Sequence, residues 1–275
     1  MGERISGLRE VANAFDAFLI DQVGVLHDGR AVYPGAAEAL GRLRATGRPT
    51  AVVSNSGKRA APNRRRLTEL GVEPTAIDAV VTSGECAREA LESWLRAGRL
   101  HPGAGVMLFT RDGETALIDG LDLRLRDDPA DVDLLIVAGV RPEDVAFAVY
   151  AERMHELAER GVPALCANPD QRIFAAGEVA FGPGALAAHY EACGGKVTWI
   201  GKPDPTIFRR AMSALGEPDA GRTLVIGDSP EHDGQGAART GCPWLFVSGG
   251  IYSDAALDGG RDKCAAAFTI DAFTW

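Results

Sequence analysis

Short apolar runs alternate with helical periodicities along this chain of 275 residues. The apolar runs are rich in β-branched residues and predict strands at Ala17–Ile20, Thr50–Ser54, Ala79–Thr82, Val106–Phe109, Leu134–Ala138, Ala164–Ala167, Val197–Ile200, Thr223–Ile226 and Leu245–Val247. Apolar positions at helical spacing predict helices at Ala36–Ala45, Arg59–Leu70, Ala87–Leu95, Asp144–Arg160, Pro205–Leu215 and Gln235–Thr240. Strands that alternate with helices are typical of an α/β fold with a parallel sheet covered on both faces.

The polar segments that could take part in catalysis or binding are unevenly spread. Two lie before residue 60 and two after residue 200. The stretch between them, from about Glu85 to Tyr190, has its own strand–helix rhythm and is long enough to be a domain. If the four segments form one site, the two ends of the chain must fold together. We therefore predict a core made of residues 1–84 and 191–275, with residues 85–190 inserted as an α/β cap domain.

Composition excludes several classes of protein. The net charge of -9 argues against broad nucleic-acid binding, which needs Lys and Arg to neutralise phosphates. We expect no membrane association, because no apolar run approaches the length that spans a bilayer. The N-terminus has no secretory apolar segment, and five scattered cysteines without CxxC spacing predict reduced thiols in a cytoplasmic protein. These cysteines are Cys86, Cys166, Cys193, Cys242 and Cys264.

Asp21 stands where the first predicted strand ends, and Gly24 is expected to turn the chain away from the sheet. A carboxylate at the carboxyl edge of a parallel sheet is well placed to act as a nucleophile or a metal ligand. A helix N-cap or turn aspartate is the simpler interpretation of this residue taken alone. The three further segments, in the right order, favour the chemical role.

Two of these segments suit phosphate binding. Ser54 and Asn55 follow a strand and precede a helix, where a hydroxyl and free backbone N–H groups form a phosphate cradle, although an ordinary N-cap serine is the alternative. Lys202 lies between Gly201 and the run Pro203–Pro205, after another strand. A lysine held there is a fixed positive charge for a phosphoryl oxygen.

The last segment suits a metal ion. Asp228 and Asp233 bracket a loop that follows the strand ending at Ile226. Hard oxygen ligands in such a loop are typical of Mg²⁺, which uses few protein carboxylates and keeps several waters. The alternative is a pair of solvated loop acids.

Taken together, the motifs resemble those of the haloacid dehalogenase superfamily over nearly the whole chain. Four stretches point further to its type IIA, nitrophenylphosphatase-like branch: Tyr33–Ala36, Thr82–Glu85, Ala167–Asp170 and Gly182–Leu186. The resemblance implies a Rossmann-like core, a mobile cap and an aspartyl-phosphate mechanism.

The resemblance also assigns roles to single residues. It implies Asp21 as the nucleophile, with Mg²⁺ held by Asp21, the Val23 carbonyl and Asp228. It further implies that Asp233 orients Lys202 or a metal-bound water, and that Ser54 and Lys202 bind the transferring phosphoryl group. We expect Asn55 and His27 to contribute to substrate binding, and a homodimer formed through the cap is compatible with this scheme.

Val23 departs from the family pattern. Phosphatases of the family have there an aspartate that protonates the leaving group and then activates water. Valine keeps the backbone carbonyl but removes the proton shuttle, a loss that typically costs about 10²–10⁴-fold in rate. His27 and Asp28 lie just downstream and could take over the proton transfer, since the pKa of an imidazole suits that task. The alternative is that His27 simply caps the turn.

Three functions remain open. The first is a Mg²⁺-dependent phosphatase of a small phosphorylated metabolite, weakened by Val23. The second is a catalytically weak relative that binds a phosphorylated ligand. The third, cleavage of a carbon–halogen or carbon–phosphorus bond, is disfavoured because Asp228 and Asp233 are retained and no small helical cap is evident.

Overall fold

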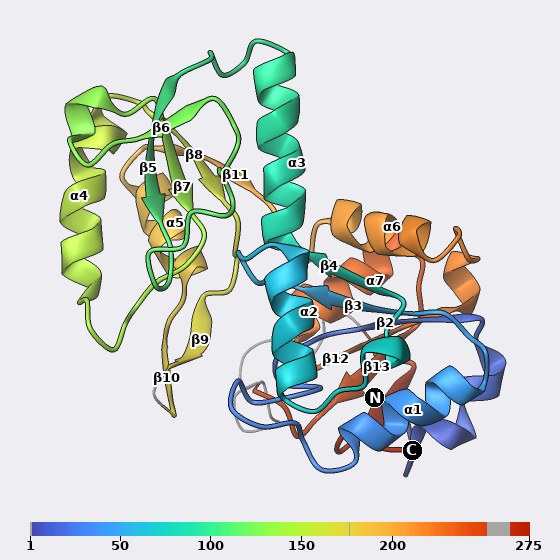
Figure 1. Cartoon of the computed structure of the whole chain (residues 1–275). Helices are drawn as coiled ribbons and strands as arrows, with labels where there is room; N and C mark the ends of the chain where they lie inside the picture. The colour runs from blue at the N-terminus through green and yellow to red at the C-terminus, as the bar shows by residue number, and fades with distance from the viewer. Residues whose placement is uncertain (1, 176, 252–264) are drawn as a thin grey trace. The chain divides into compact units, whose positions relative to one another are not determined.

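A computed structural model describes residues 2–175, 177–251 and 265–275. The chain forms two compact units. The first comprises residues up to Ser54, Ala61–Val81 and Lys202 onwards, and the second comprises Asn55–Ala60 and Thr82–Gly201. The two ends of the chain therefore belong to one unit (Figure 1).

The first unit is built on a seven-stranded sheet of order β1-β14-β13-β12-β2-β3-β4. Its strands are β1 (Glu3–Arg4), β2 (Ala17–Ile20), β3 (Thr50–Ser54), β4 (Ala79–Thr82), β12 (Thr223–Gly227), β13 (Trp244–Val247) and β14 (Phe268–Ile270). The central strands β13, β12, β2 and β3 run parallel. All residues of these four strands are buried, because helices cover both faces of the sheet.

Alternation along the strands divides the core of the first unit. Phe18 and Ile20 of β2 pack into the cluster that includes Leu40 and Leu43 of α1 (Ala36–Ala45). β2 and β3 also contact α6 (Pro205–Ala214), whose Ile207 is buried. The first unit also contains α7 (Gln235–Thr240) and, from Ala61 onwards, α2 (Ala60–Glu69). The fold class is therefore the predicted parallel α/β arrangement.

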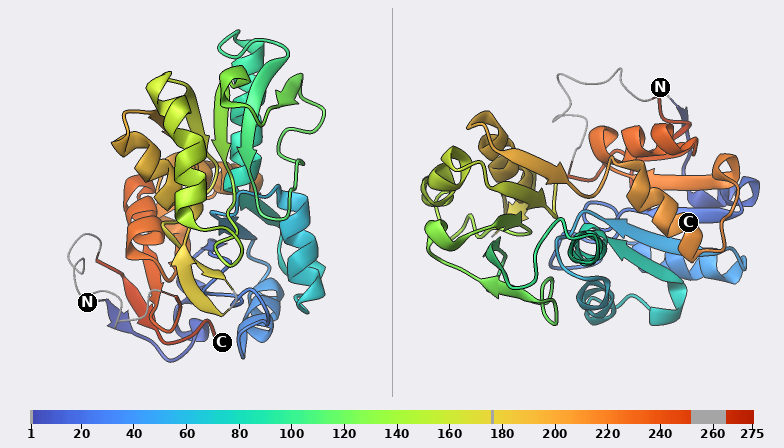
Figure 2. Two further views of the ribbon diagram at one scale, coloured as in Figure 1. Left: turned by 90° about the vertical axis from the view of Figure 1, so that its left-hand side faces the viewer. Right: turned by 90° about the horizontal axis from the view of Figure 1, so that it is seen from above.

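The second unit has its own parallel sheet of five strands, in the order β11-β8-β7-β5-β6. They are β5 (Ala104–Phe109), β6 (Leu123–Leu125), β7 (Leu134–Val137), β8 (Pro163–Cys166) and β11 (Lys196–Trp199). α4 (Phe147–Glu159) and α5 (Pro183–Ala192) pack on one face, and α3 (Ser83–Arg96) packs on the other (Figure 2). An antiparallel hairpin of β9 (Arg172–Ala175) and β10 (Glu178–Phe181) precedes α5.

The second unit is larger than the predicted insertion of residues 85–190. β11 was predicted as a strand of the core segment, but it pairs with β8, so that Val197 lies opposite Ala164. The local pattern predicts the strand and not its partner, which explains the difference.

Two sequence expectations concern cysteines and membranes. In the part of the chain that the structure describes, Cys86, Cys166, Cys193 and Cys242 form no disulfide bond, whereas Cys264 lies outside the described residues. In the part of the chain that the structure describes, no helix is both long and apolar enough to cross a bilayer.

Candidate active site

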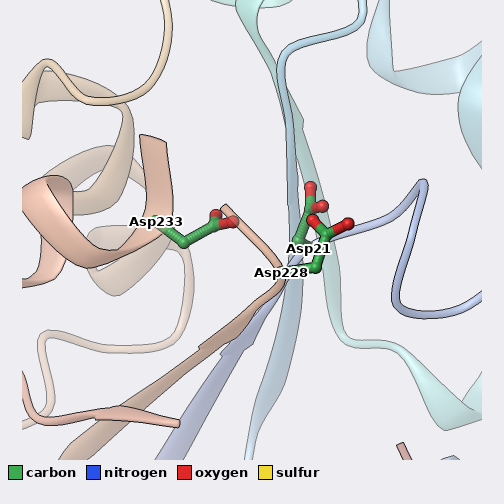
Figure 3. Close-up of side chains that lie close together, drawn as sticks. All are labelled: Asp21, Asp228 and Asp233. Atoms are coloured by element: carbon green, nitrogen blue, oxygen red, sulfur yellow. The ribbon is translucent and has the colours of Figure 1, made fainter. Parts of the chain in front are cut away.

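Asp21 and Asp228 come together because two parallel strands end at the same edge of the sheet. Asp21 follows β2 directly, and Asp228 follows β12. The strands are neighbours, with Ile20 opposite Ile226, and the backbone N–H of Asp21 donates to the Ile226 carbonyl at 2.8 Å. The two carboxylates therefore lie side by side (Figure 3). This is the edge at which α/β proteins bind their ligands.

Lys202 joins Asp21 to Asp233. Its Nζ donates to Asp21 Oδ1 at 2.5 Å and to Asp233 Oδ1 at 2.8 Å, and the lysine is only 2% exposed. Burial by itself would lower the pKa of Lys202, but the charges of Asp21 and Asp233 outweigh it and raise that pKa. Lys202 is therefore a buried ammonium with a fixed position. Asp233 is thus a direct partner of Lys202, and its orienting role stays a prediction.

Asp233 approaches the other two carboxylates from a π-helical turn, Pro230–Gly234, that follows β12 (Figure 3). Its Oδ2 accepts the backbone N–H of Ser229 at 3.2 Å. The Ser229 hydroxyl in turn accepts the N–H of His232 at 3.2 Å and caps the turn. The segment Gly227–Gly234 is thus folded so that Asp228 and Asp233 face the same site.

The three carboxylates have the arrangement of a cation site. Asp21, Asp228 and Asp233 each offer an oxygen, and these oxygens lie within 4.8 Å of one another. Burial raises the pKa of Asp21 to about 7, with Lys202 opposing the rise and Asp233 adding to it. Burial also raises the pKa of Asp228, and the charges of Asp21 and Asp233 raise it further. One ammonium faces three carboxylates, so a divalent cation would supply the remaining positive charge.

Two glycines enclose the Asp228 side chain. A Cβ on Gly24 would lie 2.2 Å from Asp228 Oδ2, and one on Gly250 would lie 2.4 Å from the same oxygen. Gly24 also has a φ of +99°, which side chains rarely adopt. The backbone N–H of Ile251 donates to Asp228 Oδ2 at 2.6 Å. This close packing fixes one oxygen of Asp228 against the backbone.

The Val23 carbonyl is suited to the ligand role predicted for it. Among the described residues it accepts no hydrogen bond. It belongs to the same peptide group as the N–H of Gly24, which donates to the His27 carbonyl at 3.0 Å. The Val23 oxygen therefore keeps its lone pairs for another partner, such as a cation.

Ser54 and Asn55 have different surroundings. Ser54 is the last residue of β3, the strand beside β2, and is 3% exposed. Asn55 belongs to the second unit, where its Nδ2 donates to Asp170 at 2.8 Å and its Oδ1 accepts from the Ser83 hydroxyl at 3.2 Å. Ser54 thus lies at the same sheet edge as Asp21. The Asn55 amide instead forms hydrogen bonds between segments of the second unit.

His27 is buried and held at both ring nitrogens. Its Nδ1 accepts the backbone N–H of Gly29 at 2.9 Å, and its Nε2 lies 3.1 Å from the side-chain amide of Gln22. Burial lowers the pKa of His27 to about 4, and the positive charge of Arg66 adds to the effect. These contacts favour the turn-stabilising role over proton donation or substrate contact. Asp28 accepts two backbone N–H groups within the same turn, from Arg30 and Ala31.

Several residues around the site have no counterpart in the sequence analysis. They are Gln22, Gly250 and Ile251. The pair Gly249-Gly250 directly after a strand is a pattern that could have indicated a close backbone approach. Gln22 carries no such pattern, because its contact depends on how the loop folds.

The chain matches known families at both ends. The haloacid dehalogenase-like hydrolase family matches residues 18–124, and the HAD-hydrolase-like family matches residues 199–274. Chronophin of Rattus norvegicus is 30% identical over 258 residues, which cover 91% of this chain and 82% of chronophin.

Solved structures agree with the sequence matches. A haloacid dehalogenase-like hydrolase from Brucella suis 1330 superposes with a TM-score of 0.85 at 29% identity, covering 98% of this chain and all of that one (100%). A glycerol phosphate phosphatase from Mycobacterium tuberculosis in complex with magnesium has a TM-score of 0.67 at 29% identity, with 91% of this chain and 74% of that chain covered. With the strand-end acids in place and these matches at both ends, the chain belongs to the haloacid dehalogenase superfamily, in the type IIA branch predicted from its motifs.

Proposed function

We propose that this protein is a Mg²⁺-dependent phosphatase that hydrolyses a small phosphorylated metabolite through a phosphoaspartate at Asp21. The observation that carries this proposal is the convergence of Asp21, Lys202 and Asp233 within hydrogen-bonding distance, beside Asp228. Chronophin and the glycerol phosphate phosphatase are similar to this chain over most of its length, which supports a phosphatase.

Asp21, Asp228 and the Val23 carbonyl would hold the Mg²⁺. The buried excess of carboxylate charge and the unengaged Val23 oxygen both fit a hard divalent cation. When bound, the ion would partly neutralise the phosphoryl oxygens and so favour attack of the Asp21 carboxylate on phosphorus. The magnesium complex of the M. tuberculosis phosphatase supports the choice of metal.

The protein's own groups account for two phosphoryl transfers. An Asp21 carboxylate oxygen attacks phosphorus, the bond from phosphorus to the leaving-group oxygen breaks, and that oxygen takes up a proton. Water then attacks the phosphorus of the phosphoaspartate, gives up a proton, and Asp21 leaves as a carboxylate. Lys202 and the Ser54 hydroxyl would bind the phosphoryl oxygens during both transfers.

The proton steps are the weak part of this machinery. Val23 offers no acid or base, and His27 is held within its own turn. We therefore infer slow turnover of substrates with poor leaving groups. This same observation favours the second candidate function, a phospho-ligand-binding protein with little catalysis.

The inserted unit would serve as the cap that the sequence predicts. It interrupts the first unit twice, at Asn55–Ala60 and at Thr82–Gly201, and carries its own sheet. Residues that recognise the leaving group would then come from this unit, which is why the motifs alone do not identify the substrate.

p-Nitrophenyl phosphate separates the two candidate functions, because its leaving group needs little protonation. We expect turnover in Mg²⁺, loss of turnover after EDTA treatment and recovery when Mg²⁺ is added back. The rate of p-nitrophenol release in steady-state assays measures turnover under each of these three conditions. Tight binding of the ester without turnover would favour the ligand-binding protein, and turnover that persists after exhaustive chelation would contradict the metal assignment.

Gly250→Ala tests the enclosure of Asp228. The added methyl group would lie 2.4 Å from Asp228 Cβ, so the carboxylate must move. We expect the Mg²⁺ affinity to fall by about 10–100-fold, the range for partners that orient a metal ligand. Titration calorimetry with Mg²⁺ measures this change. Gly41→Ala is the matched control, because a Cβ there meets nothing within 4 Å. Equal Mg²⁺ affinity in both variants would contradict the expectation.

A further inference from the structure

The loop between Asp21 and Gly29 contains a buried side-chain pair that the proposed chemistry does not use. Gln22 and His27 are each 3% exposed. The Gln22 side-chain nitrogen lies 3.1 Å from His27 Nε2, and His27 Nδ1 accepts the Gly29 N–H. Among the described residues, Gln22 Oε1 has no hydrogen-bond partner.

The imidazole chemistry fixes how this pair must bond. Because Nδ1 accepts a hydrogen bond, it carries a lone pair, and the ring proton resides on Nε2. An N–H on His27 Nε2 cannot face the NH₂ of Gln22, since both are donors. Rotating the amide by half a turn places Oε1 opposite Nε2 and gives the unpartnered oxygen its donor. The pair is therefore His27 Nε2–H donating to Gln22 Oε1.

The backbone connects this pair to the Val23 carbonyl. The N–H groups of Leu26 and His27 both donate to the Gln22 carbonyl, at 2.9 and 3.3 Å. The Gly24 N–H donates to the His27 carbonyl at 3.0 Å. Because the Gly24 N–H and the Val23 carbonyl belong to one planar peptide, the position of His27 sets the direction of that carbonyl.

We propose that Gln22 and His27 are positioning residues, whose side-chain hydrogen bond holds the Val23 carbonyl in the orientation that binds the metal. This proposal rests on the proposed function, because it assumes that the carbonyl is a Mg²⁺ ligand. It gives a role to two buried polar residues beside the nucleophile. It also separates His27 from proton transfer, since the ring acts through the loop and not on the substrate.

The test is a double-mutant cycle with Gln22→Met, His27→Phe and both changes together. Titration calorimetry measures Mg²⁺ binding to the metal-free protein, and thermal unfolding without Mg²⁺ measures stability separately. Each single change removes the same bond, so each should weaken Mg²⁺ binding by about 10–100-fold, and the double variant should be no weaker than the poorer single one. Leu40→Val is the control, a core change expected to lower the Tm without altering Mg²⁺ affinity.

¹⁵N NMR of the His27 ring provides an independent check. The proposal requires a neutral ring protonated on Nε2 in the parent protein. A ring protonated on Nδ1, or unchanged Mg²⁺ affinity in both single variants, would overturn the positioning role alone. A parent protein that binds no Mg²⁺ would overturn the proposed function together with this inference.

Discussion

Asp21→Asn is expected to reduce phosphatase turnover to the background rate while the fold is retained. Asparagine keeps an oxygen that can accept from Lys202, and Lys202 keeps its second contact with Asp233. It lacks the carboxylate that must form the bond to phosphorus. Steady-state assays with p-nitrophenyl phosphate measure the loss, and circular dichroism verifies the fold.

Asp219→Asn is the matched control for this prediction. Asp219 is an exposed aspartate of the same unit, and we expect its variant to keep full activity. If Asp21→Asn retained most of the parent activity, the covalent mechanism would be wrong. A variant that lost both activity and fold would be replaced by Asp21→Glu, which keeps the charge and misplaces the nucleophile.

Val23→Asp should speed the hydrolysis of alkyl and sugar phosphates by about 10²–10⁴-fold, the usual contribution of a general acid–base. In the parent protein, kcat/KM should fall steeply as the leaving-group pKa rises, because no group protonates the departing oxygen. The new carboxylate should flatten that dependence and leave aryl phosphates nearly unchanged. Measuring kcat/KM over a series of aryl and alkyl phosphates gives both slopes.

Val23→Asn is the control for size and polarity, and it should not flatten the dependence of kcat/KM on the leaving-group pKa. His27→Ala, assayed at saturating Mg²⁺, should keep the parent slope, because His27 is held at both ring nitrogens. A collapse of activity confined to poor leaving groups in His27→Ala would assign the proton to that residue. A flat slope in the parent would mean that leaving-group protonation does not limit the reaction.

Local sequence patterns predict a helix well where a turn or capping residue marks its end. The helix Ala36–Ala45 was predicted with the bounds it has in the structure, and it follows Gly35, which adopts a φ of +83°. The helix predicted at Ala87–Leu95 begins earlier, at Ser83, because the Thr82 hydroxyl accepts the Glu85 N–H and caps it. Thr82 and Glu85 have the spacing of a capping box, a pattern that the prediction passed over.

Elements that depend on distant partners were harder to predict. Among the described residues, β9 and β10 pair only with each other, and the helix α5 begins at Pro183, inside the stretch Gly182–Leu186 that resembles a family motif. β11 was predicted as a strand, but its pairing with β8 joins residues more than thirty positions apart in the chain and leaves no local pattern.

The residues of the site also divide into those that the local sequence predicts and those that depend on distant parts of the fold. Asp21 and Asp228 were predictable because each ends a strand, and parallel strands end at one edge. The bonds from Lys202 to Asp21 and Asp233 do not follow from strand ends, because the strand before Lys202, β11, belongs to the sheet of the second unit. The engagement of His27 by Gln22 was not predictable, since it requires the three-dimensional path of the loop between them.

The most direct test of the central claim is acid-quench mass spectrometry during turnover of p-nitrophenyl phosphate. Because Val23 supplies no base to activate water, the phosphoenzyme should break down slowly and accumulate. The account predicts one phosphoryl group on the peptide that contains Asp21, converted by borohydride to homoserine at position 21. A protein that turns over the ester with that peptide unmodified, or with the phosphoryl group on another residue, would contradict it.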